Sequence, residues 1–290
     1  MSFKILVLAK QVPDTRNVGK DAMKSDGTVN RAVLPAIFNP EDLNALEFAL
    51  RVKEQKEGAE ITIITMGPPR AAEIIREGMY RGADKGVLIT DRKFAGSDTL
   101  ATSYALSLAV QKLAPFDMVI AGRQAIDGDT AQVGPQVAEK VNIPQITYAE
   151  EFVGFNGDKV QVKRRLERGV EVLESACPVL VTVHSSAAPC RVRNAKRLMK
   201  YKHAKTDIEL QELSEDYLKL FESRPYLKIM QWSVEDLNAD VDLLGLSGSP
   251  TKVKTIESVV FTQKESITMS ASDADVNKLM KSLISSHVLG

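Results

Sequence analysis

The chain has 290 residues, 44% of them hydrophobic, and its 38 basic side chains are matched by 38 acidic ones. This length suits one large domain or two unequal ones, and the hydrophobic fraction is sufficient for a buried core. A net charge of zero excludes the strong overall field by which basic proteins attract nucleic acid or membrane surfaces. Two cysteines, Cys177 and Cys190, are too few for a disulfide scaffold and indicate a reducing cytoplasm, and three scattered histidines predict no metal site.

The first half of the chain alternates between strand-like and helix-like segments. Residues 4–9 form an apolar run before Lys10, which is too short for a signal peptide or a membrane span and is typical of a buried strand. Residues 60–65, 86–90 and 118–121 are similar runs. The segments that follow these runs carry apolar residues at helical spacing: Leu43, Leu46, Ala49 and Leu50; Ile74, Ile75 and Met79; Leu106, Ala109, Val110 and Leu113; and Val133, Val137, Ala138 and Val141. This alternation predicts an α/β fold with a doubly wound, mostly parallel, Rossmann-like sheet.

A helix start follows the first strand at one edge of this sheet. Asn39 is a favoured N-cap residue, Pro40 suits the first helical turn, and Glu41 and Asp42 place negative charge beside the positive end of the helix dipole. Ligands of doubly wound sheets bind beyond the carboxyl ends of the strands, where such turns gather. We therefore expect this segment to lie close to a ligand site.

A second helix start begins at Asp98, which is also a favoured N-cap residue. Three hydroxyls follow it, on Thr99, Thr102 and Ser103, and this number exceeds what a cap requires. Back-bonding of a hydroxyl to its own helix explains one of them equally well. The remaining hydroxyls are candidate hydrogen-bond donors at the same sheet edge.

The most informative segment joins the apolar run 118–121 to the helical pattern that begins at Val133. It is polar and contains Gly122 and Gly128. Backbone N–H groups converge at such a turn and the helix dipole favours negative charge, which predicts an anion or nucleotide site. Neither a GxGxxG motif nor the Gly-Lys-Ser/Thr end of a P-loop occurs here, so a phosphotransferase is not indicated. An ordinary strand-to-helix loop is the alternative interpretation.

The pattern changes after about residue 146. Residues 159–163 and 170–172 alternate between apolar and polar side chains around a turn at 166–169, which predicts a β-hairpin added to the sheet. Residues 178–183 form another strand-like run.

The last third of the chain has few apolar repeats apart from a short helix around residues 276–284. We therefore divide the chain into a nucleotide-binding α/β domain that includes the hairpin, residues 1–185, and a partner-contacting loop with a C-terminal arm, residues 186–290. Because the arm cannot bury its apolar side chains on itself, we expect it to need a partner.

Five segments together resemble the beta subunit of electron transfer flavoprotein. They are residues 7–15 (VLAKQVPDT), residues 39–42 with Ala45 and Glu47, residues 65–69 (TMGPP), residues 82–84 (GAD) and all of residues 122–134. Each alone would be weak evidence, but their common order and the length of the last segment make the resemblance specific. It covers residues 1–185 closely and weakens after them. It implies a heterodimer in which an alpha subunit holds a flavin.

The resemblance also implies that this subunit has a nucleotide site of its own. The residues that it assigns to this site are Ala9, Asn39, Pro40, Glu41, Asp42, Met66, Gly122, Arg123, Gln124, Ala125, Ile126, Asp127, Gly128, Asp129, Thr130, Ala131, Gln132 and Val133. Helix capping explains Asn39 and Asp42 as well as ligand contact does, and core packing is the commoner role of a methionine such as Met66.

The identity of the nucleotide decides the function that the resemblance implies. Conventional family members hold AMP, which is structural, and accept electrons from dehydrogenases. A second class holds FAD, takes a hydride from NADH and bifurcates the electron pair, with one electron going to ferredoxin or flavodoxin and the other through the alpha flavin to an acyl-CoA dehydrogenase. FAD extends beyond its second phosphate and needs extra donors, which the hydroxyls after Asp98 offer at the same sheet edge, so Asp98, Thr99 and Thr102 are assigned to the cofactor site as well. Together with residues 127–134 and 245–251, these features favour the FAD-bearing, electron-bifurcating class.

The loop after residue 183 departs from the family pattern. The family carries an Asn-Glu-Pro-Arg-Tyr-like sequence and a leucine that docks the dehydrogenase, whereas alignment here puts Ala195 at the leucine position. The docking mode and the acceptor are therefore left open. Residues 191–205 contain seven Lys or Arg, which fit a solvated face or an acidic protein partner better than nucleic acid, because Tyr201 is the only interleaved aromatic residue. A nucleotide-binding signalling module on the same fold is a further hypothesis.

Overall fold

The computed structural model describes residues 2–14, 35–211, 215–252 and 266–289, so Thr15, which ends the first of the segments compared above, lies outside it. The strands are β1 (Lys4–Leu8), β2 (Gln11–Pro13), β3 (Ala36–Phe38), β4 (Glu60–Met66), β5 (Lys85–Ile89), β6 (Met118–Gly122), β7 (Gln145–Asn156), β8 (Lys159–Leu166), β9 (Gly169–Ala176), β10 (Val179–Val183) and β11 (Met230–Trp232). The α-helices are α1 (Pro40–Gln55), α2 (Ala72–Arg81), α3 (Thr99–Lys112), α4 (Val133–Val141), α5 (Ala195–Tyr201), α6 (Asp207–Gln211), α7 (Glu215–Ser223) and α8 (Asp273–Ser285).

Within the described residues, one nine-stranded sheet has the order β11-β5-β4-β1-β6-β10-β7-β8-β9. Strand β1 pairs in parallel with β4 on one side and with β6 on the other. Parallel pairing continues outward to β11 in one direction and to β7 in the other, and β8 and β9 are antiparallel. The prediction of a doubly wound, mostly parallel sheet with an added hairpin is confirmed.

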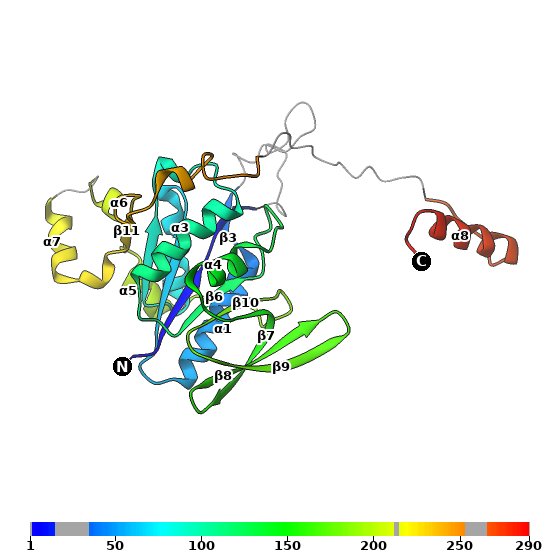
Figure 1. Cartoon of the computed structure of the whole chain (residues 1–290), viewed down its shortest axis with the longest axis horizontal. Coiled ribbons are helices and arrows are strands. Elements are labelled where there is room, and N and C mark those ends of the chain that lie inside the picture. The colour runs from blue at the N-terminus through cyan, green and yellow to red at the C-terminus, as the bar shows by residue number, and fades with distance from the viewer. Residues whose placement is uncertain (1, 15–34, 212–214, 253–265, 290) are drawn as a thin grey trace.

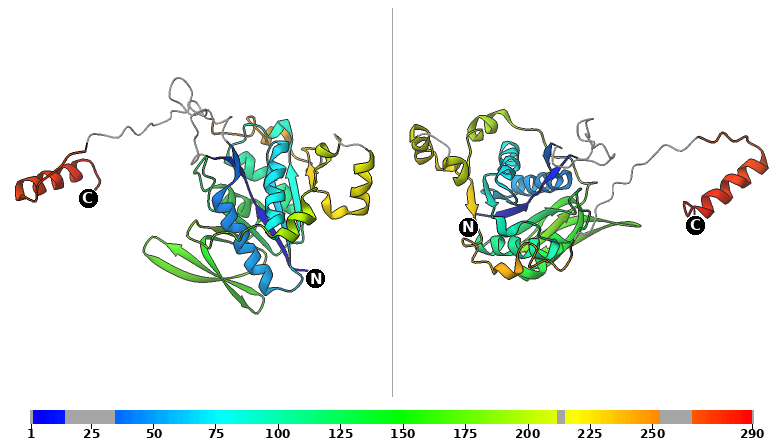
Figure 2. Two further views of the ribbon diagram at one scale, coloured as in Figure 1. Left: turned by 180° about the vertical axis from the view of Figure 1, so that it is seen from behind. Right: turned by 90° about the horizontal axis from the view of Figure 1, so that it is seen from above.

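Both faces of the sheet are covered by helices (Figures 1 and 2). Alternate residues of a strand point to opposite faces, and β1 shows this directly. Ile5 and Val7 pack in the cluster that includes the apolar faces of α1 and α2. Leu6 and Leu8 pack in the cluster that includes α3 and α4. The helices therefore connect parallel strands on both sides, and the polar turns collect at the carboxyl edge of the sheet.

The hairpin contains a strand that the sequence pattern did not reveal. Strand β7 pairs with β8, and its register shifts once between Ala149 and Glu151 and again between Phe152 and Gly154. These irregularities interrupt the two-residue alternation by which a strand is recognised, so β7 escaped the sequence analysis. The buried face of this extension packs on α1, where the rings of Phe48 and Phe152 meet edge to face at 5.9 Å.

The chain after β10 returns to the sheet. Strand β11 pairs in parallel with β5 at the outer edge, and Leu227 and Ile229 just before it are buried. Three residues are too short a run to be recognised from periodicity, so this strand was not predicted. The division of the chain at residue 185 remains a prediction.

The short helix expected near residues 276–284 is α8. It stands apart from the sheet in Figures 1 and 2, and it has no buried residue. Within the described ranges, no helix has the length and apolar composition needed to cross a bilayer.

Candidate functional site at the carboxyl edge of the sheet

The carboxyl ends of three neighbouring strands bring three of the predicted site residues to one edge. Ala9 directly follows β1 and is buried, with its N–H donating to the carbonyl of Ile64 at 2.9 Å. Met66 ends β4 and Gly122 ends β6. Met66 is half-buried and packs against the cluster beneath α3, so core packing is at least part of its role.

Asn39 connects the start of α1 to the polar turn of residues 123–132, which we call the site turn. Asn39 is fully buried, and its side chain does not cap α1. Its Nδ2 donates to the carbonyl of Gln124 at 2.9 Å, and its Oδ1 accepts from the N–H of Ile126 at 3.2 Å. Of the two roles that the sequence left open for Asn39, side-chain capping is therefore wrong, and the side chain instead supports the turn.

Glu41 supports the first residues of the same turn. Its carboxylate accepts from Arg123 Nη2 at 2.9 Å and from the backbone N–H of Gln124 at 3.1 Å. Both partners of the ion pair are mostly shielded from solvent, with side-chain exposures of 22% for Arg123 and 8% for Glu41. This pairing raises the pKa of Arg123.

Asp42 joins the ends of β1 and β6. Its Oδ2 accepts from the N–H of Lys10 at 2.7 Å and its Oδ1 from the N–H of Gly122 at 3.1 Å. Burial raises the pKa of Asp42 to about 7, although the hydrogen bonds from Lys10, Asn39 and Gly122 oppose this rise. The side chains of Asn39 and Glu41 therefore bond to the site turn, and that of Asp42 bonds to Gly122 just before it.

The site turn itself is half-buried or exposed. Lys10 Nζ pairs with Asp127 of the turn at 2.8 Å, and Gln124 Nε2 donates to Asp129 Oδ1 within the turn at 2.8 Å. Asp129 and Ala131 have positive φ angles of 49° and 52°. Left-handed backbone is uncommon in residues other than glycine and often occurs at functional sites. An ordinary strand-to-helix loop would not explain this set of constraints.

The helix that follows the turn can receive an anion at its start. In the described chain, the N-cap residue of α4, Gln132, does not cap its helix with its side chain. Gln132 Oε1 instead accepts from Thr99 Oγ1 at 2.9 Å. Pro135 has no N–H, so the first turn of α4 leaves the N–H groups of Val133 and Gly134 available to a ligand, and the helix dipole favours a negatively charged one.

The start of α3 lies beside the start of α4. Asp98 caps α3 through the N–H groups of Leu100 and Ala101, and Ser103 Oγ lies 2.8 Å from the carbonyl of Leu100 in its own helix and 3.0 Å from Gln136 Oε1, so that its one proton serves one of these two acceptors. Thr102 is half-buried on the first turn of α3. The structure thus brings the hydroxyl-bearing segment next to the site turn, as the sequence analysis expected. The carboxylate of Asp98 stands at the α3 terminus and would repel a phosphate there, so α4 is the better phosphate position.

Two residues at this edge were missed by sequence reasoning. Lys10 directly follows Ala9 after the carboxyl end of β1. Its place beside a predicted site residue at a strand end is the signal that would have identified Lys10 as a site residue. Tyr148 lies in β7, with the guanidinium of Arg123 at 5.7 Å from its ring, the ring of His184 stacked at 5.8 Å, and a φ angle of 59°. A local sequence pattern has no sign of this cluster, because β7 itself was not recognised.

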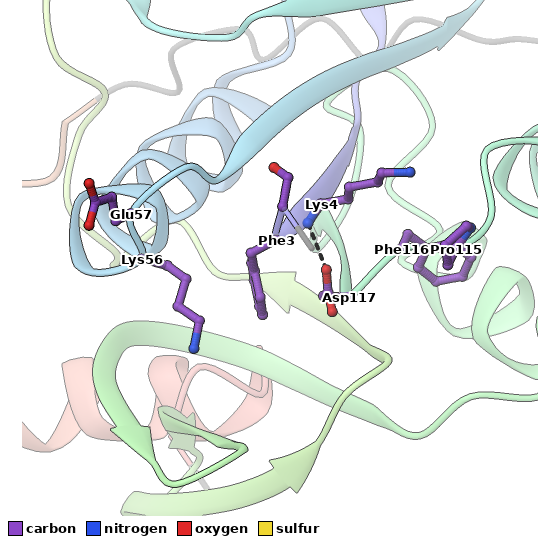
Figure 3. A pocket seen from close by; sticks show the side chains of 8 residues that line it. Phe3, Lys4, Lys56, Glu57, Pro115, Phe116 and Asp117 are labelled. Carbon is purple, nitrogen blue, oxygen red and sulfur yellow. Dashed lines mark hydrogen bonds between the residues drawn. The ribbon is translucent and has the colours of Figure 1, made fainter.

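Two hollows lie away from this edge. One of about 380 Å³ opens at the amino ends of β1 and β6, between Phe3, Lys56 and Asp117, and Figure 3 shows the hydrogen bond from the N–H of Lys4 to Asp117 beside it. The other, of about 480 Å³, lies between the ends of α1 and α2 and the segment 191–197. Ligands of parallel sheets bind at the carboxyl edge, so we assign neither hollow to the nucleotide.

The arrangement suits a bound nucleotide more than side-chain catalysis. The site turn offers backbone amides, short polar side chains and a helix start, held from below by Asn39, Glu41 and Asp42. Within the described part of the chain, no group of three or more metal-ligating side chains is found. These features fit an adenine nucleotide whose phosphates lie at α4. The assignment of individual residues to ligand contact remains a prediction.

Comparison with known proteins shows which family the chain is similar to. Residues 26–212 match the family model described as electron transfer flavoprotein domain. The electron transfer flavoprotein subunit beta of Clostridium acetobutylicum is 44% identical over 87% of this chain and 86% of its own length. The subunit of the same name from Thermoanaerobacterium thermosaccharolyticum is 42% identical over 99% of this chain and 100% of its own. The acryloyl-CoA reductase electron transfer subunit gamma of Anaerotignum propionicum is 41% identical over the same shares.

Proposed function

The chain belongs to the electron transfer flavoprotein family, and on this premise we propose that it is the beta subunit of an electron-bifurcating member that binds FAD. In this proposal an alpha subunit completes a heterodimer in the cytoplasm. NADH supplies a hydride, one electron passes to ferredoxin or flavodoxin, and the other passes through the alpha flavin to an acyl-CoA dehydrogenase. Because the chain belongs to this family, we do not retain the hypothesis of a nucleotide-binding signalling module on the same fold.

The observation that carries this proposal is the contact between Thr99 and Gln132. The 2.9 Å hydrogen bond places the start of α3 directly beside the site turn and the start of α4. AMP needs only the turn and one helix start. FAD continues past its second phosphate, and the hydroxyls of Thr99 and Thr102 offer donors for that continuation.

The residues of this chain hold the cofactor and do no covalent chemistry. The flavin of a bound FAD supplies the hydride and single-electron chemistry. Asn39 and Glu41 hold the site turn and Asp42 holds Gly122 just before it, and the N–H groups of Val133 and Gly134 at the start of α4 would bind the phosphates. The name of the Anaerotignum relative, an acryloyl-CoA reductase subunit, supports an acyl-CoA-linked acceptor for the present chain as well.

Helix α8 supports a partner-dependent arm. Val276, Leu279, Met280 and Ile284 recur at helical spacing along α8 and are between 42% and 54% exposed. Such a stripe is stable when it is buried against another surface. We assign it to the alpha subunit.

The basic segment after β10 is the proposed dehydrogenase surface. All three of its arginines have partners, which fastens the segment to α1 and α2. Arg191 pairs with Glu47 at 2.9 Å, Arg193 pairs with Glu77 at 2.6 Å, and Arg197 Nε donates to the carbonyl of Met79 at 2.8 Å. Val192 and Met199 remain 84% and 62% exposed. Exposed apolar side chains surrounded by basic residues suit an acidic protein partner. Because Ala195 stands where the family has its docking leucine, we assign the main apolar contact to the larger side chain of Met199.

One measurement separates the two forms of the function. The heterodimer is purified, its visible spectrum is recorded, and the nucleotides released by denaturation are identified. The proposal expects two flavins per heterodimer and reduction of both by NADH. One flavin with one AMP would contradict it and would establish the conventional electron carrier.

A further inference from the structure

The turn of residues 245–251, which we call the clasp, is fastened to the segment that precedes α3. The N–H of Gly245 donates to Ser97 Oγ at 3.1 Å, and the N–H of Asp98 donates to Ser249 Oγ at 2.8 Å. The N–H of Thr251 donates to Asp98 Oδ2 at 3.0 Å. Ser249 is only 2% exposed, so the bond that it accepts is partly shielded from water, whereas the bond between Thr251 and Asp98 lies at the surface. These three bonds join residues that are 148 to 153 positions apart in the chain.

The clasp fits its position closely. Gly245 has a φ angle of 54°, and a Cβ added there would lie 2.4 Å from the carbonyl oxygen of Lys93. Leu244, just before it, is buried in the cluster beneath α3. A glycine is needed at 245 because both the backbone conformation and the close approach exclude a side chain. The clasp is a built contact and not a chance crossing of two loops.

Asp98 divides its two carboxylate oxygens between two tasks. Oδ1 accepts from the N–H groups of Leu100 and Ala101 at 2.9 and 3.1 Å and so caps α3. Oδ2 accepts from Thr251. Burial alone would raise the pKa of Asp98, but the hydrogen bonds from Ala101, Thr251 and Leu100 outweigh it and hold this pKa below its ordinary value.

The next residues connect this point to the site turn. Thr99 Oγ1 donates to Gln132 Oε1 at 2.9 Å, and Ser103 Oγ lies 3.0 Å from Gln136 Oε1 on the first turn of α4. A continuous path of hydrogen bonds therefore runs from Thr251 through Asp98 and the start of α3 to the end of the site turn. Any ligand that orders the site turn also favours the geometry in which Asp98 can hold the clasp.

We propose that Asp98 is a positioning residue that fixes the base of the C-terminal arm to the nucleotide site, so that nucleotide binding and docking of the arm stabilise each other. The proposal rests on the nucleotide site proposed above. Because such coupling is reciprocal, release of the arm lowers nucleotide affinity by the same factor by which the nucleotide holds the arm. Thr251 lies at the base of the arm, so the bond at this residue is the part of the clasp that holds the base of the arm to Asp98.

Asp98→Asn separates the two tasks of this carboxylate. Asparagine caps a helix as well as aspartate does, so α3 keeps its cap through one oxygen. The amide nitrogen that replaces Oδ2 cannot accept from Thr251. Ser249→Ala removes the hydrogen bond that the N–H of Asp98 donates to the clasp, and it leaves the carboxylate of Asp98 unchanged. Asp240→Asn is the matched control, because Asp240 caps a short helix by accepting from Asp242 at 3.0 Å and is not part of the path to the site turn.

The test is tryptic cleavage after Lys252 in the heterodimer, with peptides identified by mass spectrometry. Cofactor-stripped heterodimer is digested alone, with AMP and with FAD, and binding of each nucleotide is measured separately. For the wild type and Asp240→Asn, the bound nucleotide is expected to slow cleavage about threefold to tenfold, which is the effect of one hydrogen bond of ordinary net strength. For Asp98→Asn and Ser249→Ala, cleavage is faster from the start and the nucleotide no longer slows it.

Two results would overturn the proposal. One is cleavage of Asp98→Asn at the wild-type rate, which would show that Asp98 does not hold the arm. The other is nucleotide that binds to the wild type without slowing cleavage, which would show that the two sites are independent. If neither AMP nor FAD binds the wild type, the proposed function fails and the coupling with it, whereas the rates measured without nucleotide still decide whether Asp98 holds the clasp.

Discussion

Asp42 Oδ1 accepts the backbone N–H of Gly122 at 3.1 Å, and it occupies the space in which a side chain at residue 122 would begin. A Cβ added to Gly122 would lie 2.4 Å from this oxygen and 2.7 Å from the backbone carbon of Glu41. The end of β6 and the start of α1 are therefore packed backbone against backbone. This contact sets the direction in which the chain enters the site turn.

Gly122→Ala is expected to destabilise the protein by about 1–3 kcal/mol, because backbone atoms of α1 cannot move aside as a flexible side chain could. It should also reduce the nucleotide content of the purified complex. Gly128→Ala is the control within the same turn, since a Cβ there meets nothing within 4 Å. Urea unfolding midpoints and released nucleotide are measured for both. Equal midpoints for the two variants would contradict the close packing.

Asn39→Ala is expected to weaken nucleotide binding about tenfold or more, because it removes the two hydrogen bonds that hold Gln124 and Ile126 in the site turn. Asn44→Ala is a matched control on the same helix. Asn44 also makes two bonds to backbone, with the carbonyls of Ala187 and Ala188 at 3.1 and 2.9 Å, but these lie outside the turn. Both variants should lose stability, and only Asn39→Ala should lose affinity in a titration of the stripped complex. Equal affinities would remove Asn39 from the support of the site.

Asp42 should make stability depend on pH. Its pKa rises from 3.8 to about 7 on folding. Between these values the folded chain binds a proton that the unfolded chain releases, so the free energy of unfolding falls as pH rises from about 4 to about 7, by up to about 1.4 kcal/mol per pH unit. Asp42→Asn removes this contribution.

Urea unfolding at a series of pH values tests this expectation. The slope between pH 4 and 7 should differ between wild type and Asp42→Asn. Asp117→Asn, which changes a carboxylate at the opposite sheet edge that accepts from the N–H of Lys4 at 2.7 Å, should keep the wild-type contribution of Asp42. If Asp42→Asn has the wild-type slope, Asp42 is already ionised in the folded protein throughout this range.

Thr99→Val combined with Thr102→Val should separate FAD from AMP. The pair removes two hydroxyls while it keeps the volume and the Asp98 cap of α3. If FAD is bound, one flavin per heterodimer and NADH oxidation should be lost while the alpha flavin remains. If AMP is bound, the flavin count should not change. Ser107→Ala controls for effects on the helix, because Ser107 Oγ only donates back to Tyr104 O within α3 at 2.7 Å.

The sequence alone determined the order of strands and helices and the edge at which the site lies. Apolar runs such as residues 118–121 and helical repeats such as Val133, Val137 and Val141 are local signals, because burial on a sheet requires them wherever the chain folds back. Ligands gather at the carboxyl ends of parallel strands, and this rule was sufficient to predict that Asn39 and the site turn lie together. Strand β7 was missed because bulges remove that local signal, and strands β2, β3 and β11 were missed because three residues are too few to show it.

Only the tertiary structure decided what the side chains at this edge do. Local sequence left helix capping and ligand contact open for Asn39, and the structure shows a third role, in which its side chain bonds to a turn 85 residues away. Likewise, Arg191 and Arg193 in the segment after β10 pair with acids on α1 and α2, and Asp98 holds Thr251 across 153 residues. A buried donor or acceptor takes whichever partner folding brings within about 3 Å, and that partner depends on the packing of whole elements and not on the residues beside it in the chain.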